Sequence, residues 1–260
     1  MIILSIKTCF ALICRDMMVF REGFVDRCIN GLIWVVLNTL VFQYIFTQMG
    51  MAADYGPFMV CANIMSWGFF EVMENVSRLI SDLQSDSSLT YDMTLPLPHW
   101  LIFTRMALSN ALQAMSIGFF ILPVSKLILW HEFNLSQVSW CGFILIFIIG
   151  HIFYGFFSLW LASMVKNMQA IGNIWTRVVF PLWWLGGYQF SWKTLRTFSP
   201  IVANIALCNP VTFCFEGIRA VILGQEGYIG WGYCFIVLTA FTVAVGYIGT
   251  KKMMRRLDCL

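Results

Sequence analysis

Residues 209–224 read Asn-Pro-Val-Thr-Phe-Cys-Phe-Glu-Gly-Ile-Arg-Ala-Val-Ile-Leu-Gly, and the rest of the chain is best interpreted outward from this stretch. Asn209 suits a helix N-cap, Pro210 suits the first helical position, and Gly224 suits the left-handed residue that ends a helix. The helix between them is too short to cross a bilayer, which needs about 20 residues. Glu216 and Arg219 lie three positions apart, so we expect them to pair on one helix face.

An uncharged apolar run follows directly, at residues 228–248, and it is long enough to span a membrane. A short capped helix that carries a charged pair, placed just before a span, predicts a re-entrant or interfacial helix. Backbone of this kind is tolerated at membrane depth only where protein or a water-filled cavity surrounds it. We therefore expect residues 191–227 to form a re-entrant outer segment with two short helices.

The composition indicates an all-α membrane protein with a single domain over residues 1–260. Hydrophobic residues make up 60% of the chain and charged residues only 11%, whereas soluble domains carry about 25% charged residues. The net charge of +3 is spread over several loops, so we expect no nucleic-acid partner. Apolar runs predict six transmembrane helices, at residues 29–47, 57–77, 106–125, 140–164, 171–190 and 228–248.

The first 27 residues predict an amphipathic helix that lies in the membrane interface. Apolar side chains recur there at spacings of three and four, and Arg15 and Asp16 fall on the other side. The apolar positions are Ile3, Ile6, Phe10, Ile13, Met17, Phe20 and Phe24.

Basic residues predict the orientation of the six spans. With an even number of spans, both termini lie on one side of the membrane. Twelve basic residues fall on that side: Lys7, Arg15, Arg21, Arg27, Arg78, Arg105, Lys166, Arg177, Lys251, Lys252, Arg255 and Arg256. Four fall on the other: Lys126, Lys193, Arg196 and Arg219. The positive-inside rule therefore predicts that both termini are cytoplasmic.

At residues 209–224 the chain resembles the type-2 ATP-binding-cassette (ABC) exporter permeases, the membrane subunits of bacterial exporters of polysaccharides, drugs and lipids. The resemblance rests on Asn209-Pro210, Glu216-Gly217-Ile218-Arg219 and Leu223-Gly224, and on the Pro-aromatic-glycine run at 181–187. It implies a bacterial inner-membrane homodimer that works with two ATP-binding cassette subunits. It also implies that the N-terminal helix touches the ATPase.

The segment at 79–105 is the largest predicted cytoplasmic connection, and two interpretations of it stay open. In it, Asp92 precedes Leu95-Pro96-Leu97-Pro98, which stops a helix and presents apolar side chains. One interpretation is a solvated connection. The resemblance implies the other, a coupling loop in which Asp92, Leu95, Pro96 and Leu97 dock onto the ATPase.

A candidate substrate path lies at the outer end of the fifth span. Trp183, Trp184 and Tyr188 can stack on sugars, but they can equally contact lipid or a drug, and aromatic residues also belong at bilayer interfaces. Arg177 lies about six positions into the span. It either extends back to the inner headgroups or meets an anionic substrate group.

Several kinds of chemistry have no signature in the chain. No G-x-x-x-x-G-K-[ST] phosphate loop occurs, so we expect no ATPase activity here, and ATP and Mg²⁺ are expected in the partner subunit. The nine cysteines contain no C-x-x-C pair and the three histidines are far apart, so we expect no metal site. Ser109, Asn110 and Gln113 in the third span fit helix packing better than substrate contact.

These features together predict a permease, and not an enzyme, that exports an amphipathic substrate: a glycan, a glycolipid, a lipid or a drug. An ion-coupled carrier and a non-transport structural membrane protein are the alternatives. A carrier needs ionisable residues near the bilayer midplane, and few are present.

Overall fold

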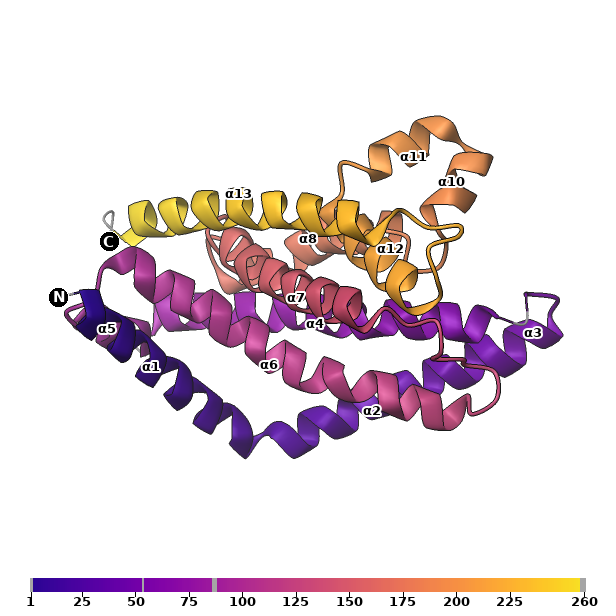
Figure 1. Cartoon of the computed structure of the whole chain (residues 1–260). Coiled ribbons are helices and arrows are strands. Elements are labelled where there is room, and N and C mark those ends of the chain that lie inside the picture. The colour runs from indigo at the N-terminus through magenta and orange to yellow at the C-terminus, as the bar shows by residue number, and fades with distance from the viewer. Residues whose placement is uncertain (1, 53, 86–87, 258–260) are drawn as a thin grey trace.

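The computed structural model describes residues 2–52, 54–85 and 88–257, and within these ranges it contains helices and turns but no strand (Figure 1). The first half of the chain forms α1 (Ile2–Glu22), α2 (Phe24–Leu40), the π-helix η1 (Val41–Ile45), α3 (Phe46–Gln48), α4 (Tyr55–Gln84), α5 (Ser88–Met93) and α6 (His99–Ile128). The second half forms α7 (Trp140–Ala162), the 3-10 helix η2 (Met168–Ala170), α8 (Ile171–Ile174), the π-helix η3 (Trp175–Val179), α9 (Phe180–Leu185), α10 (Trp192–Phe198), α11 (Pro200–Ala206), α12 (Pro210–Ile222) and α13 (Trp231–Leu257).

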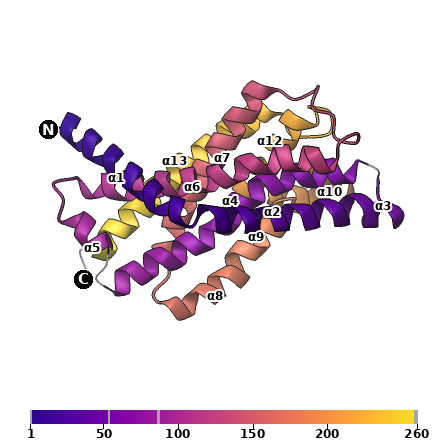
Figure 2. The same ribbon diagram turned by 90° about the horizontal axis from the view of Figure 1, so that it is seen from below.

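The long helices α2, α4, α6, α7 and α13 run along one common direction and pack side by side (Figure 1). Both ends of the chain and α5 lie at one end of this bundle, and α3, α10 and α11 lie at the other (Figures 1 and 2). The structure therefore has two distinct ends, which we call the terminal end and the α10–α11 end.

Four helical stretches among the described residues are long and apolar enough to cross a membrane: Phe24–Gln48, α6, α7 and α13. The number rises to five if the bent pair α11 and α12 is counted as one crossing. This establishes a multi-pass membrane protein. Helix α4 is as long as α6, but it carries Glu71 and Glu74 and is not among these four.

The N-terminal helix is shorter than the predicted range of 1–27. Helix α1 ends at Glu22, a turn follows at Gly23, and α2 begins at Phe24 (Figure 1). Glycine ends a helix readily because it loses more backbone entropy than other residues when ordered. The placement of α1 in a membrane interface stays a prediction.

The connection predicted at 79–105 is also shorter than expected. Helix α4 continues to Gln84 and α6 begins at His99, so only residues 85–98 connect them, with α5 in between. The predicted boundary follows the end of the apolar run, where charged residues begin. Charged residues do not end a helix, so α4 continues beyond that boundary. Pro98 precedes α6 with extended backbone, as the Pro-rich run predicts.

The fifth predicted span, 171–190, is helical only as far as Leu185 and contains a π-helical turn. Pro181 has no N–H group, so it cannot bond the carbonyl of Arg177 four residues earlier. The chain accommodates the proline with the wider turn of η3, in which the Phe180 N–H bonds Trp175 O. Gly187 then adopts a left-handed conformation with φ of 85° and turns the chain away.

Residues 191–227 hold three short helices, and not the two that were predicted. The third is α12, and its bounds are those expected from residues 209–224. The two before it each start at a serine that caps its helix: Ser191 accepts from Thr194 N and Ser199 accepts from Val202 N. Helices α11 and α12 meet at an angle of 96°.

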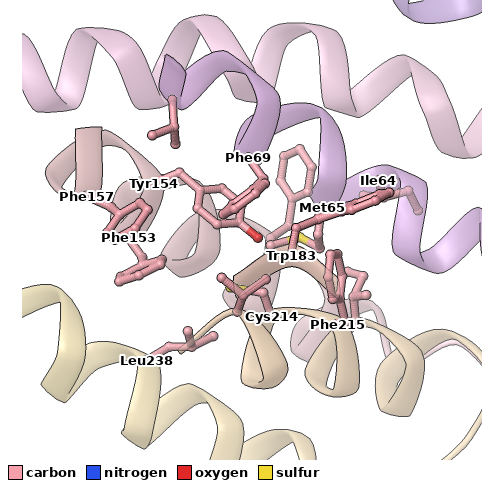
Figure 3. Close-up of a cluster of buried hydrophobic side chains, with 14 of the residues drawn as sticks. Ile64, Met65, Phe69, Phe153, Tyr154, Phe157, Trp183, Cys214, Phe215 and Leu238 are labelled. Carbon is pink, nitrogen blue, oxygen red and sulfur yellow. The ribbon is translucent and has the colours of Figure 1, made fainter. Parts of the chain in front are cut away.

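Helix α12 lies in the protein interior and not at the surface. Every residue from Val211 to Ile222 is buried, including the charged residues Glu216 and Arg219. It packs against α4, α7, α9 and α13. Figure 3 shows part of this core, where Cys214 and Phe215 of α12 meet Met65, Tyr154 and other side chains of α4 and α7.

Candidate functional site

The ends of α12 are built as its sequence predicts. The Asn209 side-chain oxygen accepts from Val211 N at 3.0 Å, and its amide nitrogen donates to Leu182 O at 2.6 Å. The cap therefore also ties α12 to the end of α9. Gly224 has φ of 101°, the left-handed conformation expected after the last turn.

Arg219 is completely buried and holds the turn after α9. Its guanidinium donates to the carbonyl oxygens of Gly187 and Tyr188, each at 2.6 Å, and to Phe190 O at 3.2 Å. It also lies 3.6 Å from the centroid of the Phe58 ring of α4, a cation–π contact. These partners leave the guanidinium enclosed by the protein.

Glu216 is 1% exposed and holds two other backbone groups. Its carboxylate accepts from Trp192 N at 2.8 Å and from Ile229 N at 3.1 Å. The predicted pair is present, because Arg219 Nη1 lies 4.0 Å from Glu216 Oε1. Yet the nearest partners of both charges are backbone groups. The two side chains therefore fix the start of α10, the turn at 187–190 and the entry to α13 against α12.

The candidate substrate-path residues do not form one surface. Trp183 and Tyr188 are buried and stack at 4.2 Å between ring centroids, whereas Trp184 and Arg177 are exposed. The Trp183 indole donates to Ser66 Oγ at 3.2 Å. The Tyr188 hydroxyl lies 2.8 Å from Asn38 Oδ1 and 2.9 Å from Asn63 Oδ1. Tyr188 therefore joins the turn after α9 to α2 and α4.

An aromatic groove of about 490 Å³ lies between α2, α4 and the α8–α9 stretch. The Phe70 ring lies 5.5 Å from both the Trp34 and the Trp183 ring and 6.4 Å from the Trp175 ring. The full lining is Asn30, Trp34, Trp67, Phe70, Trp175, Phe180 and Trp183. Of these residues only Trp183 was a predicted candidate, since the sequence gives no indication that these three segments are neighbours.

Two indole N–H groups of the groove lining have no hydrogen-bond partner among the described residues. They belong to Trp34 and Trp67, and both nitrogen atoms are buried. An unpaired buried donor costs free energy, about 1–3 kcal/mol. Because both nitrogen atoms are shielded, they are not presented to the open space of the groove.

A network of charged residues joins α1, α5 and α6 at the terminal end. Asp92 of α5 is buried and accepts from Arg15 of α1 at 3.1 Å and also from Arg105 of α6. Arg105 in turn pairs with Asp16 of α1, which accepts from Ser109 at 2.8 Å. The hydrogen bond to Asp92 raises the pKa of Arg15 above its ordinary value.

The apolar residues after Asp92 differ in their exposure. Pro96 is exposed, Leu95 is partly buried, and Leu97 is buried within this chain. Leu97 is therefore not available to a partner protein in this structure. Tyr91, which sequence analysis did not select, is exposed on α5.

The polar residues of the third span make contacts within the protein. Ser109 donates to Asp16, and Gln113 accepts from Arg78 of α4 at 3.4 Å. These contacts agree with the helix-packing interpretation. Among the described residues, no group of three histidine, cysteine or acidic side chains lies together as a metal site requires, and Cys259 lies outside those residues.

Comparison with known families gives a clear match. The family model described as ABC-2 type transporter matches residues 7–223, which include α12, the α5 connection and all but the last long helix. A comparison with curated proteins gives no match.

Proposed function

The chain belongs to the ABC-2 type transporter family, and from this premise we propose that it is the permease through which an ABC exporter moves an amphipathic substrate. The family's membrane domain is the permease component of an ABC transporter, and it lacks the ATPase motifs. The catalytic ATPase lies in a separate ATP-binding cassette subunit. ATP and Mg²⁺ therefore bind that partner in our proposal.

We propose six spans, with the two termini in the cytoplasm of a bacterial cell and the protein in its inner membrane. The two proposed spans beyond the four membrane-capable stretches are α4 and the stretch 168–185. Helix α4 packs along α6 and α7 over its length, which supports a crossing. Its charged residues Glu71 and Glu74 are paired with Arg27 of α2, so their cost in a membrane is reduced.

We propose that α5 and the adjoining residues receive the motion of the ATPase. The charged network supports this role, because it joins the exposed α5 connection to α1 and to the start of α6 through ion pairs, of which Arg105–Asp92 is buried and the other two are partly exposed. A displacement of α5 would therefore act on two other helices. Arg105 is central to this arrangement, since it contacts both Asp16 and Asp92.

We propose a homodimer as the working unit. An apolar stripe on α2 and η1 supports it, since a transmembrane helix can pack through such a face onto a second copy. The stripe recurs at helical spacings and consists of the exposed side chains Ile29, Ile33, Leu37, Leu40 and Tyr44.

The aromatic groove is the single observation that carries the substrate assignment. Its rings favour contact with sugar faces or acyl chains. A glycolipid offers both kinds of surface, and a glycan offers the first. The α12 charges do not serve as a substrate site in this proposal, because backbone groups already occupy them.

The test is export from proteoliposomes that contain the permease and its ATP-binding cassette subunit. We expect Trp34→Ala and Trp175→Ala each to reduce export and substrate-stimulated ATP hydrolysis. Trp140→Ala is the matched control, because Trp140 is exposed at the start of α7 and does not line the groove. Equal export by all three variants would exclude the groove as the substrate site.

A further inference from the structure

A second groove lies between α6, α7 and α13, separate from the aromatic groove, and has a volume of about 580 Å³. Its lining is Trp100, Thr104, Phe156, Thr242, Val243, Gly246, Tyr247, Thr250, Lys251 and Met254. We propose that this groove binds one anionic phospholipid, with an acyl chain along α13 and the phosphate at Lys251.

The dimensions fit one leaflet of a bilayer. Along α13 the lining extends from Thr242 to Met254, and these twelve steps along the helix correspond to about 18 Å at 1.5 Å per residue. Half of the hydrocarbon core of a bilayer is about 15 Å. The groove opens onto an exposed surface, because Val243 and Tyr247 are among the most exposed large apolar side chains of the chain.

The chemistry of the lining favours an acyl chain over a sugar. Two of its three threonines have hydroxyl groups that already donate to carbonyls of their own helix, Thr104 to Trp100 O at 2.8 Å and Thr242 to Leu238 O at 2.7 Å. These donors are therefore not free for a glycan. Gly246 packs against the Phe156 ring, which would lie 3.0 Å from a Cβ at this position. The glycine thus keeps the floor of the groove smooth and apolar.

The charge at one end of the groove favours an anionic headgroup. Lys251 is exposed, and among the described residues it has no carboxylate partner, only a contact of 5.6 Å with the Tyr247 ring. Arg255 is exposed one turn further along α13 and raises the local positive potential. These residues lie toward the C-terminal end of α13, at the terminal end of the bundle (Figure 1). A phosphate at this level would replace the missing counter-charge.

The experiment uses the full-length permease in proteoliposomes with a photo-crosslinking diazirine on the acyl chain of either phosphatidylglycerol or phosphatidylcholine. The readout is the lipid attached to the peptide that contains Val243–Tyr247, measured by mass spectrometry. We expect phosphatidylglycerol to label this peptide more strongly than phosphatidylcholine. Lys251→Gln should reduce that preference about fivefold, the effect of one lysine near an anionic surface.

Lys252→Gln is the matched control for the headgroup, because Lys252 is equally basic and exposed but does not line the groove. For the acyl chain, Thr104→Phe should fill the groove and reduce labelling by both lipids. Ser116→Phe, on the same helix and with the same hydroxyl-to-carbonyl bond, should not. The proposal is overturned if both lipids label equally, if the two lysine variants behave alike, or if Thr104→Phe leaves labelling unchanged. Absence of labelling by either lipid also overturns it and would indicate that protein covers the groove.

Discussion

At the scale of single residues, Glu216 and Arg219 each carry a desolvation cost, since both are buried beside apolar core side chains. Their spacing on one helix predicts a pair, but it says nothing about the turn at 187–190, which supplies the closest partners of Arg219. The spacing of two residues along one helix predicts contacts between those two residues, and not contacts with other segments. Backbone carbonyls from a distant turn have no sequence signal at all.

The first prediction concerns this pair. Removing one member of a buried charge pair leaves the other uncompensated, so Arg219→Gln and Glu216→Gln should each destabilise the permease by about 3–5 kcal/mol. The double variant should cost less than the sum of the two, with a coupling energy of about 0.5–3 kcal/mol. Chemical unfolding of the purified proteins measures stability, and export is measured in parallel.

Arg219→Lys separates charge from geometry in the same experiment. Lysine keeps the positive charge but lacks the planar guanidinium that reaches three carbonyl oxygens, so we expect stability between that of the wild type and that of Arg219→Gln. If Arg219→Gln abolished export while stability stayed unchanged, the residue would act on the substrate, and the structural role would be wrong.

At the scale of elements, the parts that could be predicted are those with local causes. Asn209, Pro210 and Gly224 define α12 through capping and backbone conformation, and the structure has the same bounds. The aromatic groove could not be predicted, because Trp34, Trp67 and Trp175 come from three segments whose packing depends on the whole bundle. The π-helical turn η3 could be predicted in part. Pro181 predicts an interruption of the helical hydrogen bonding, but it does not predict that the interruption is a π-helical turn.

The second prediction concerns α5 as the contact with the ATPase. Tyr91 is 60% exposed there, and Tyr91→Asp places a charge on the proposed contact surface without entering the protein core. We expect loss of most transport-coupled ATP hydrolysis, measured in proteoliposomes, while the permease still accumulates in the membrane. Leu97→Asp is a poorer probe, since Leu97 is buried and the variant should misfold.

Trp130→Asp is the control for this variant. Trp130 is 61% exposed, which matches Tyr91, but it follows α6 at the other end of that helix. We expect Trp130→Asp to retain transport-coupled ATP hydrolysis. The proposal would be wrong if Tyr91→Asp hydrolysed ATP during transport as the wild type does and still co-purified with the ATPase. In that case α5 would not be part of the contact surface.

At the scale of the whole molecule, the position of the termini constrains the topology. The bundle places both termini and the 85–98 connection at one end, and the loop before α4, which contains Asp54, lies at the other (Figure 1). This arrangement agrees with an even number of spans. In the proposed topology α4 also crosses the membrane, although its buried polar residues, such as Asn63 and Glu71, lower its hydropathy.

The third prediction tests the orientation and the α4 crossing together. A compartment-specific reporter fused to the C-terminus or inserted after Ser85 should be active only in the cytoplasm, whereas one inserted at Asp54 should be active only outside. The physical reason is the distribution of basic residues, twelve on the side of the termini and four on the other, which favours retention of the basic side. The same activity at Asp54 and Ser85 would mean that α4 does not cross. The reversed pattern at all three sites would place α5 and its charged network outside the cell, where no ATPase could reach them.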